Sequence, residues 1–141
     1  MAVSFFNADI PFRLPQKLFL KKFIQETFFA TTAKKISVNY IFCSDDYLLK
    51  INRDFLKHDF YTDIITFPLN ETQKRIDAEI YISINRVREN ATQQKVEFEN
   101  ELLRVIFHGI LHLAGYKDKT SKEQKIMREM ENCWISDFSR Q

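Results

Sequence analysis

Glycine and cysteine are both scarce in this chain. Only two of its 141 residues are glycine, where average usage of about 7% would give around ten. The two cysteines, Cys43 and Cys133, lie far apart and form no CxxC pair. Such sparse cysteine usage favours two unpaired thiols in a cytoplasmic protein over a disulfide.

Long hydrophobic runs are missing as well. The longest uncharged apolar segment, residues 105–116, has 12 residues, whereas a membrane helix needs about 18 or more. Residues 1–17 contain no basic stretch followed by an apolar run, so we expect no signal peptide. The sequence therefore predicts a soluble, intracellular protein without a membrane partner.

The overall composition is that of an ordinary globular domain. Hydrophobic residues make up 45% and charged residues 28%, which excludes a disordered or collagen-like chain. A chain of 141 residues suits one domain, residues 1–141, and buries enough surface to fold without a structural metal. The formal charge of +2 leaves a nucleic-acid partner open, because clustering of basic residues decides that question.

Hydrophobic periodicity predicts a mixture of helices and strands. Helical spacing indicates helices over residues 16–29, 45–56, 85–94 and 97–114, and a last helix that begins after Thr120 or Ser121. Along that last helix, Ile126, Met130 and Trp134 are spaced by four residues. Strand-like segments cover residues 36–43, 63–69 and 78–84, and Pro68 ends the second of them. We expect an α+β fold, in which several helices cover a small mixed β-sheet.

Two histidines lie in the most apolar of these helices. His108 and His112 are four residues apart, so their side chains share one face of the helix, one turn apart. Gly115 follows where a helix ends in a left-handed residue, and the chain then turns toward Asp118. Two imidazoles and a carboxylate leave a fourth position of a catalytic zinc open for water. The spacing predicts that His108, His112 and Asp118 bind one Zn²⁺ per chain on a zincin-like metal helix.

Both glycines of the chain lie in this same segment. Gly109 is in mid-helix, where glycine costs about 1 kcal/mol relative to alanine, so we expect a neighbour that needs the room. The alternative is that both histidines are core residues hydrogen-bonded to carbonyls. Gly115 and Asp118 favour the metal over that alternative, because two buried imidazoles need partners and one ion serves both.

The segment HGILHLAGYKD resembles the YbeY family of bacterial rRNA-maturation factors, whose pattern reads H-G-x-L-H-L-x-G-Y-D-H. The matching positions are His108, Gly109, Leu111, His112, Leu113, Gly115 and Tyr116. The resemblance continues upstream and downstream. It includes Asn52, Phe55, Asp59, Thr62, Asp63, the following IITFP, Met127 and Glu131, and so covers residues 40–135.

Two segments of the chain depart from the family pattern. The pattern has Asp then His where this chain has Lys117 and Asp118, so the resemblance implies a site of two histidines and one aspartate. Leu56 stands where the family has its catalytic Arg. A leucine side chain cannot donate a charged hydrogen bond to a phosphate. Arg53 or Lys57 is the nearby candidate to replace it. We therefore assign candidate catalytic roles to Arg53 and to Lys117, which adjoins the proposed ligand.

The resemblance implies a zinc-dependent, single-strand-specific endoribonuclease. Its implied role is rRNA maturation, with processing of the 3′ end of 16S rRNA, in ribosome biogenesis or quality control. The implied partners are single-stranded RNA and the small ribosomal subunit with its proteins, and not DNA. The rings of Phe60 and Tyr61 would offer stacking faces to unpaired bases.

Two rival interpretations belong to other classes. A zinc protease uses the same ligand spacing but needs Glu after the first His as general base, and that position is Gly109. A metal-stabilised, non-catalytic module that binds the ribosome or its RNA stays open, because Leu56 replaces the catalytic Arg. Cleavage of single-stranded RNA by native and by metal-stripped protein distinguishes the enzyme from the module.

Overall fold

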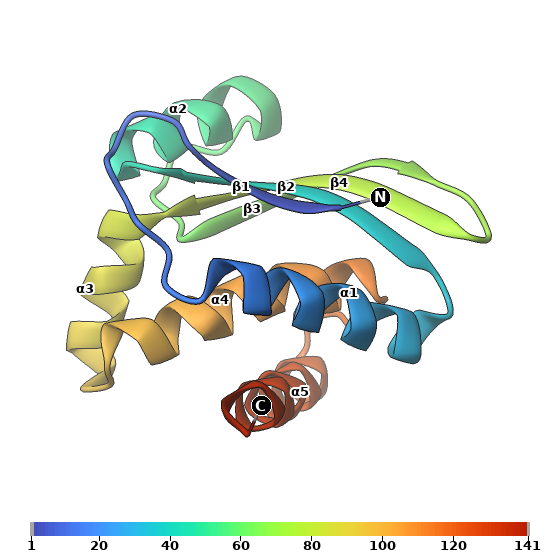
Figure 1. Cartoon of the computed structure of the whole chain (residues 1–141). Helices are drawn as coiled ribbons and strands as arrows, with labels where there is room; N and C mark the ends of the chain where they lie inside the picture. The colour runs from blue at the N-terminus through green and yellow to red at the C-terminus, as the bar shows by residue number, and fades with distance from the viewer. Residues whose placement is uncertain (1, 141) are drawn as a thin grey trace.

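The computed structural model describes residues 2–140, over which the chain forms four strands and five helices. In chain order these are β1 (Val3–Asn7), α1 (Lys17–Thr32), β2 (Lys35–Cys43), α2 (Asp45–Leu56), β3 (Ile64–Glu71), β4 (Arg75–Ser83), α3 (Ile84–Gln94), α4 (Phe98–Leu113) and α5 (Ser121–Ser139). The prediction of an α+β fold is confirmed (Figure 1).

The sheet is mixed, with strand order β1-β2-β4-β3. β1 and β4 both run parallel to β2, while β3 runs antiparallel to β4. Strand β2 covers the strand predicted at residues 36–43 and buries alternate residues, since Ile36, Val38, Tyr40 and Phe42 are each at most 1% exposed. The sequence patterns did not predict β1, a five-residue strand whose partner follows only after the whole of α1.

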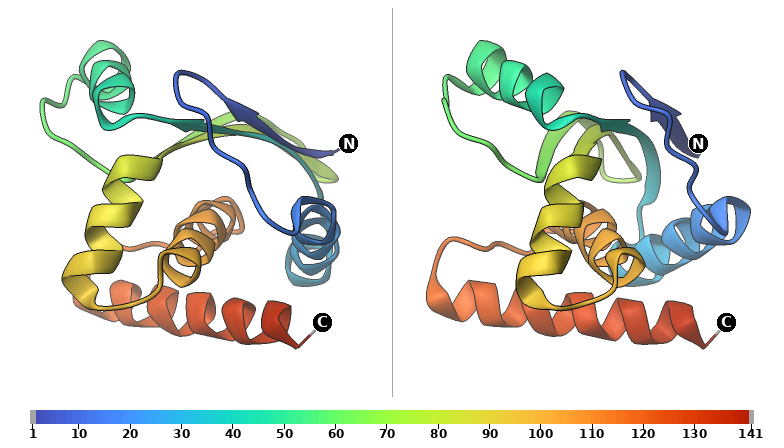
Figure 2. Two further views of the ribbon diagram at one scale, coloured as in Figure 1. Left: turned by 60° about the vertical axis from the view of Figure 1, so that its left-hand side comes forward. Right: turned by 90° about the vertical axis from the view of Figure 1, so that its left-hand side faces the viewer.

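The helices lie on both faces of the sheet. Helix α2 lies on one face, whereas α1 and α4 lie on the other, and α5 runs beyond α4 on the side away from the sheet (Figures 1 and 2). Helix α4 is therefore covered on two sides, by the sheet and by α5, as suits the most apolar helix of the chain. Its buried apolar residues are Leu102, Val105, Ile106, Phe107, Ile110 and Leu111.

Helix caps follow the sequence closely. The Ser44 hydroxyl accepts a hydrogen bond from the Tyr47 backbone N–H at 3.1 Å and begins α2. Thr120 begins α5 with a reciprocal capping box, in which the Glu123 side chain accepts a hydrogen bond from the Thr120 backbone N–H. Both cysteines are free thiols. Within residues 2–140, no helix is both long and apolar enough to cross a membrane.

Strand β3 does not end at Pro68, as the sequence suggested, but continues to Glu71. Proline lacks an N–H to donate, so it is tolerated in edge strands and at bulges. β3 is an edge strand, and its register with β4 shifts between Pro68 and Asn70. Two other elements are longer than predicted: α1 continues to Thr32, and β4 already begins at Arg75.

The buried face of α5 does not follow the four-residue spacing of Ile126, Met130 and Trp134. Ile126 is 40% exposed, and the buried residues of the helix are Met127, Glu131, Trp134 and Phe138. Residues spaced strictly by four drift around a helix of 3.6 residues per turn, whereas spacings of four, three and four hold one face. Of the three residues spaced by four, only Trp134 belongs to the buried face, and that face contains a carboxylate, Glu131.

Candidate metal centre

Helix α4 and the turn that follows it bring the three predicted ligands together. His108 and His112 project from neighbouring turns of α4, and Gly115 ends the helix region with a φ of 107°. Asp118 then approaches both rings, with its Oδ2 3.2 Å from His108 Nε2 and 3.3 Å from His112 Nε2. We call His108, His112 and Asp118 the metal triad.

The geometry of the metal triad suits a tetrahedral ion. One donor atom from each residue lies within 4.8 Å of the others, and within residues 2–140 this is the single such group. Two ligands at about 2.1 Å from a tetrahedral zinc are about 3.4 Å apart, which is close to the spacing found here. The three side chains are between 21% and 36% exposed, so solvent or a substrate can reach the remaining coordination position.

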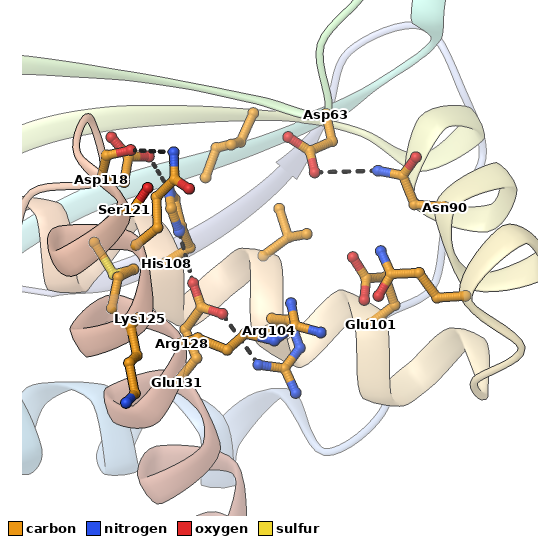
Figure 3. A pocket seen from close by; sticks show the side chains of 15 residues that line it. Asp63, Asn90, Glu101, Arg104, His108, Asp118, Ser121, Lys125, Arg128 and Glu131 are labelled. Atoms are coloured by element: carbon orange, nitrogen blue, oxygen red, sulfur yellow. Dashed lines mark hydrogen bonds and ion pairs between the residues drawn. The ribbon is translucent and has the colours of Figure 1, made fainter.

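A buried carboxylate on α5 fixes the orientation of His108. Glu131 Oε2 lies 2.7 Å from His108 Nδ1, and its Oε1 accepts a hydrogen bond from Arg104 at 3.0 Å. Only 5% of the Glu131 side chain is exposed. When the neutral ring donates Nδ1–H to this carboxylate, its Nε2 lone pair lies on the side of Asp118, as a metal-binding histidine requires. Figure 3 shows His108 between Asp118 and Glu131.

The charges around His108 also change its pKa. Burial acts to lower the pKa of His108, but the hydrogen bond to Glu131 and the negative charges of Glu131, Asp118 and Asp63 raise it above its ordinary value. Burial raises the pKa of Asp63 as well, partly opposed by His108 and by a hydrogen bond from Asn90 at 3.3 Å. The negative charges around His108 therefore favour a cation bound at the metal triad.

Gly109 lies where α4 meets the sheet. A Cβ at this position would stand 2.9 Å from Ile80 Cδ1 and 3.0 Å from Ile64 Cδ1. Side chains of the sheet thus occupy the space beside Gly109 that the sequence predicted to be filled. The missing Cβ lets α4 approach β3 and β4 closely enough for His108 to face Asp63. Because this position holds no Glu, the general base that a zinc protease needs is missing.

Two cavities meet at His108 and Asp118. One, of about 680 Å³, is bordered by α5 and is called the α5 pocket; its lining includes Asp63, Asn90, Glu101, Arg104, Arg128 and Glu131. The other, of about 610 Å³, is bordered by the segment between α2 and β3 and is called the loop pocket; its lining includes Leu56, His58, Phe60, Thr62, His112 and Leu113. Figure 3 shows the α5 pocket from close by. A polymer bound across the metal triad would therefore have one cavity on each side of the triad.

The loop pocket contains a histidine that the sequence patterns did not single out. The rings of His58 and Phe60 stack, with centroids 5.2 Å apart. Buried Asn52 holds the segment in place, because its backbone carbonyl accepts from His58 N–H and its side chain donates to the Phe60 carbonyl. Phe60 is 56% exposed. Tyr61, the other expected stacking ring, already has the Arg86 guanidinium 5.0 Å from its centre.

The two predicted catalytic cations lie outside the cavities. Arg53 pairs with Asp59 on the surface, and Lys57 Nζ donates to the Asp54 carbonyl at 3.4 Å. Lys117 is exposed in the turn next to Asp118. None of the three cations borders the α5 pocket or the loop pocket, so the structure does not bring Arg53 or Lys117 to the metal triad.

The sequence spacing did indicate the charged residues around the metal triad to which the sequence analysis assigned no role. Glu101, Arg104, His108 and His112 follow one another at intervals of three, four and four, which puts them on one face of an otherwise apolar helix. Glu131 likewise interrupts the apolar stripe of α5. Charged residues on a buried helix face need partners, so their spacing alone indicates a site.

The chain is similar to several known proteins. A family model described as endoribonuclease YbeY matches residues 10–139. A protein from Cytophaga hutchinsonii named endoribonuclease YbeY is 48% identical over 139 residues, which cover 95% of this chain and 94% of that protein. One of the same name from Amoebophilus asiaticus is 43% identical over 133 residues, covering 94% and 90%. A solution structure of a Thermotoga maritima protein gives a TM-score of 0.60 at 30% identity, covering 96% of this chain and 88% of that one.

Proposed function

The chain belongs to the YbeY endoribonuclease family, and we propose that it is a zinc-dependent endoribonuclease specific for single-stranded RNA. Family membership makes it a hydrolase that acts on RNA. The observation that carries the zinc requirement is the metal triad, in which Asp118 Oδ2 lies 3.2 and 3.3 Å from the two imidazole nitrogens.

The residues around the metal triad support one zinc per chain. Two nitrogen donors and one oxygen donor match a catalytic zinc site with an open fourth position. When bound, zinc polarises a phosphate oxygen and lowers the pKa of a water molecule. Glu131 holds His108 in the required tautomer, and Arg104 holds Glu131. These two residues therefore position a metal ligand.

The cavities on the two sides of the metal triad support single-stranded RNA as the substrate. The loop pocket offers the exposed ring of Phe60, on which an unpaired base can stack. A paired duplex keeps its bases stacked inside, so it could not use that ring. We retain Lys117 and Arg53 as candidates for contact with the RNA backbone. Arg53 would have to exchange Asp59 for a phosphate, since the two are paired here.

The cellular role rests on the family alone. We propose that residues 1–141 act as one metallohydrolase domain in the cytoplasm. Its substrate there is rRNA, with maturation of the 3′ end of 16S rRNA as the step in ribosome biogenesis. Its partners are the small ribosomal subunit and the proteins of that subunit. Pull-down of ribosomal subunits with a catalytically inactive variant tests this part separately from the chemistry.

The direct test joins metal analysis to an activity assay. We expect about one zinc per chain in the purified protein, cleavage of a single-stranded RNA, and loss of cleavage on chelation that added zinc restores. His112→Ala should lower zinc content well below one per chain, whereas Cys133→Ser, which changes an exposed thiol, should not. Full zinc occupancy in His112→Ala contradicts the metal assignment. RNA binding without cleavage by the zinc-loaded protein favours the non-catalytic module instead.

A further inference from the structure

Glu101 is a buried carboxylate that the metal triad does not explain. It lies in the first turns of α4, is only 4% exposed, and its Oε1 has no hydrogen-bond partner among residues 2–140. Burial raises the pKa of Glu101, while the guanidiniums of Arg104 and Arg128 act in the opposite direction. A buried polar atom without a partner costs free energy and calls for a ligand that completes its hydrogen bonds.

The α5 pocket is the space that such a ligand would occupy. Glu101 borders it together with Asp63 and Asn90, and His108 and Asp118 form its wall toward the metal triad. In Figure 3 these side chains surround the cavity, with Asp63 and Asn90 on the side opposite Arg104 and Arg128. A ligand in the α5 pocket therefore lies beside any group bound at the metal triad.

A second cation does not fit this environment. Within residues 2–140 the metal triad is the single group that brings three metal-binding side chains together, and Glu101 is not part of it. Arg128 and Lys125 border the pocket on its α5 side, where they would repel an added cation. The pocket instead suits a ligand that donates hydrogen bonds at one end, toward Glu101, and carries negative charge at the other.

A guanine nucleotide has this combination. Its base carries the N1–H and the N2 amino group side by side, and a carboxylate accepts both bonds at once. Adenine and cytosine present only the amino group next to an acceptor on the same edge. The phosphate of the nucleotide would meet Arg128 and Lys125, two exposed α5 side chains that form no salt bridge within residues 2–140.

We propose that the α5 pocket binds the guanine base of the nucleotide next to the cleaved phosphodiester, with the Glu101 carboxylate as its hydrogen-bond acceptor. This assignment rests on the proposed function only in placing the base next to the cleaved bond. The loop pocket then receives the nucleotide on the other side of the metal triad. The protein would accordingly prefer to cut single-stranded RNA beside a guanosine.

Mononucleotides test the pocket without any cleavage, because they contain no internucleotide bond. The zinc-loaded protein is titrated calorimetrically with guanosine, inosine and adenosine 5′-monophosphates. Inosine differs from guanosine only in lacking the N2 amino group, so we expect it to bind about tenfold more weakly, and adenosine more weakly still. This comparison uses the unmodified protein and does not depend on the folding of a variant.

Matched variants then assign the preference to Glu101. Glu101→Gln should abolish the difference between guanosine and inosine, whereas Glu99→Gln, an exposed carboxylate in the same helix turn, should leave it intact. Arg128→Ala should weaken the binding of all three nucleotides by a similar factor, because all three carry the same phosphate. Thermal unfolding of each variant verifies that it is folded.

Three outcomes overturn the proposal: equal affinity for guanosine and inosine monophosphates, a preference that survives in folded Glu101→Gln, or a second bound zinc that Glu101→Gln removes. Failure of the proposed function looks different. Guanine preference without RNA cleavage contradicts the nuclease and leaves the pocket assignment intact. Zinc-dependent cleavage without guanine preference contradicts the pocket alone.

Discussion

Leu56 occupies the position at which the family resemblance implies a catalytic Arg. It borders the loop pocket and is 39% exposed, so a longer charged side chain fits there without burial of its charge. We predict that Leu56→Arg raises the rate of RNA cleavage by about tenfold or more, because a guanidinium binds phosphate oxygens bidentately. The measurement is kcat/KM on one single-stranded RNA. Leu69→Arg, at another exposed leucine, is the control.

An unchanged rate in Leu56→Arg would mean that another side chain already contacts the phosphate. His58 borders the loop pocket, whereas Arg53 and Lys57 do not. In that case His58→Ala should lower kcat/KM and Lys57→Ala should not. A loss confined to Arg53→Ala would show that Arg53 leaves Asp59 when RNA binds.

Gly109 is a residue whose side chain is absent for a steric reason. Ile80, against which a Cβ would press, is fully buried. We predict that Gly109→Val lowers the free energy of unfolding by about 2 kcal/mol, because overpacking outweighs the gain in helix propensity. Urea unfolding followed by circular dichroism measures the change. An unaltered midpoint would show that Ile80 and Ile64 move aside at no cost.

At the scale of the element, α5 contacts the candidate metal centre through one side chain. Glu131 reaches across to α4 and holds both His108 and Arg104. We predict that Glu131→Gln lowers zinc affinity by about 10- to 100-fold, because the metal ligand loses the charged partner that fixes its orientation. Competition with a chelator of known affinity measures this without any RNA.

The control for that variant lies two residues away. Glu129 is exposed on the same helix, so Glu129→Gln removes an equal charge without touching His108 and should leave zinc affinity unchanged. Equal affinities of Glu131→Gln and the unmodified protein would show that α5 covers α4 without positioning its histidine. A fall in zinc affinity in both variants would show that the net charge of the surface, and not the contact with His108, sets the affinity.

At the scale of the whole molecule, the hydrophobic core and the metal centre are separate. The core cluster joins the sheet to α1, α4 and α5 through residues such as Tyr40, Phe107 and Trp134, and none of the metal triad belongs to it. We predict that the metal-stripped protein keeps its far-ultraviolet circular dichroism and unfolds cooperatively. Its midpoint should rise with added zinc, because zinc binds the folded state. Unfolding on chelation alone would contradict this prediction.

Features that depend on near neighbours in the chain follow from the amino-acid sequence alone. The caps at Ser44 and Thr120, the alternation in β2 and the central position of α4 all come from spacing along one segment, and the structure has them. His108 and His112 share a helix face for the same reason. Asp118 follows shortly after them in the chain, so the group of three residues that could hold a metal ion could be predicted from their spacing.

Features that depend on residues far apart in sequence arise only when the chain folds. Pro68 fits in a strand because β3 is at the sheet edge. Glu131 lies 23 positions after His108, yet it fixes that ring, and Glu101 gains its pocket only when α5 folds beside α4. Arg53 and Lys117 were chosen for closeness in sequence, and their side chains lie outside both cavities. Helix packing sets the direction in which a side chain points, and the spacing within one segment does not contain that information.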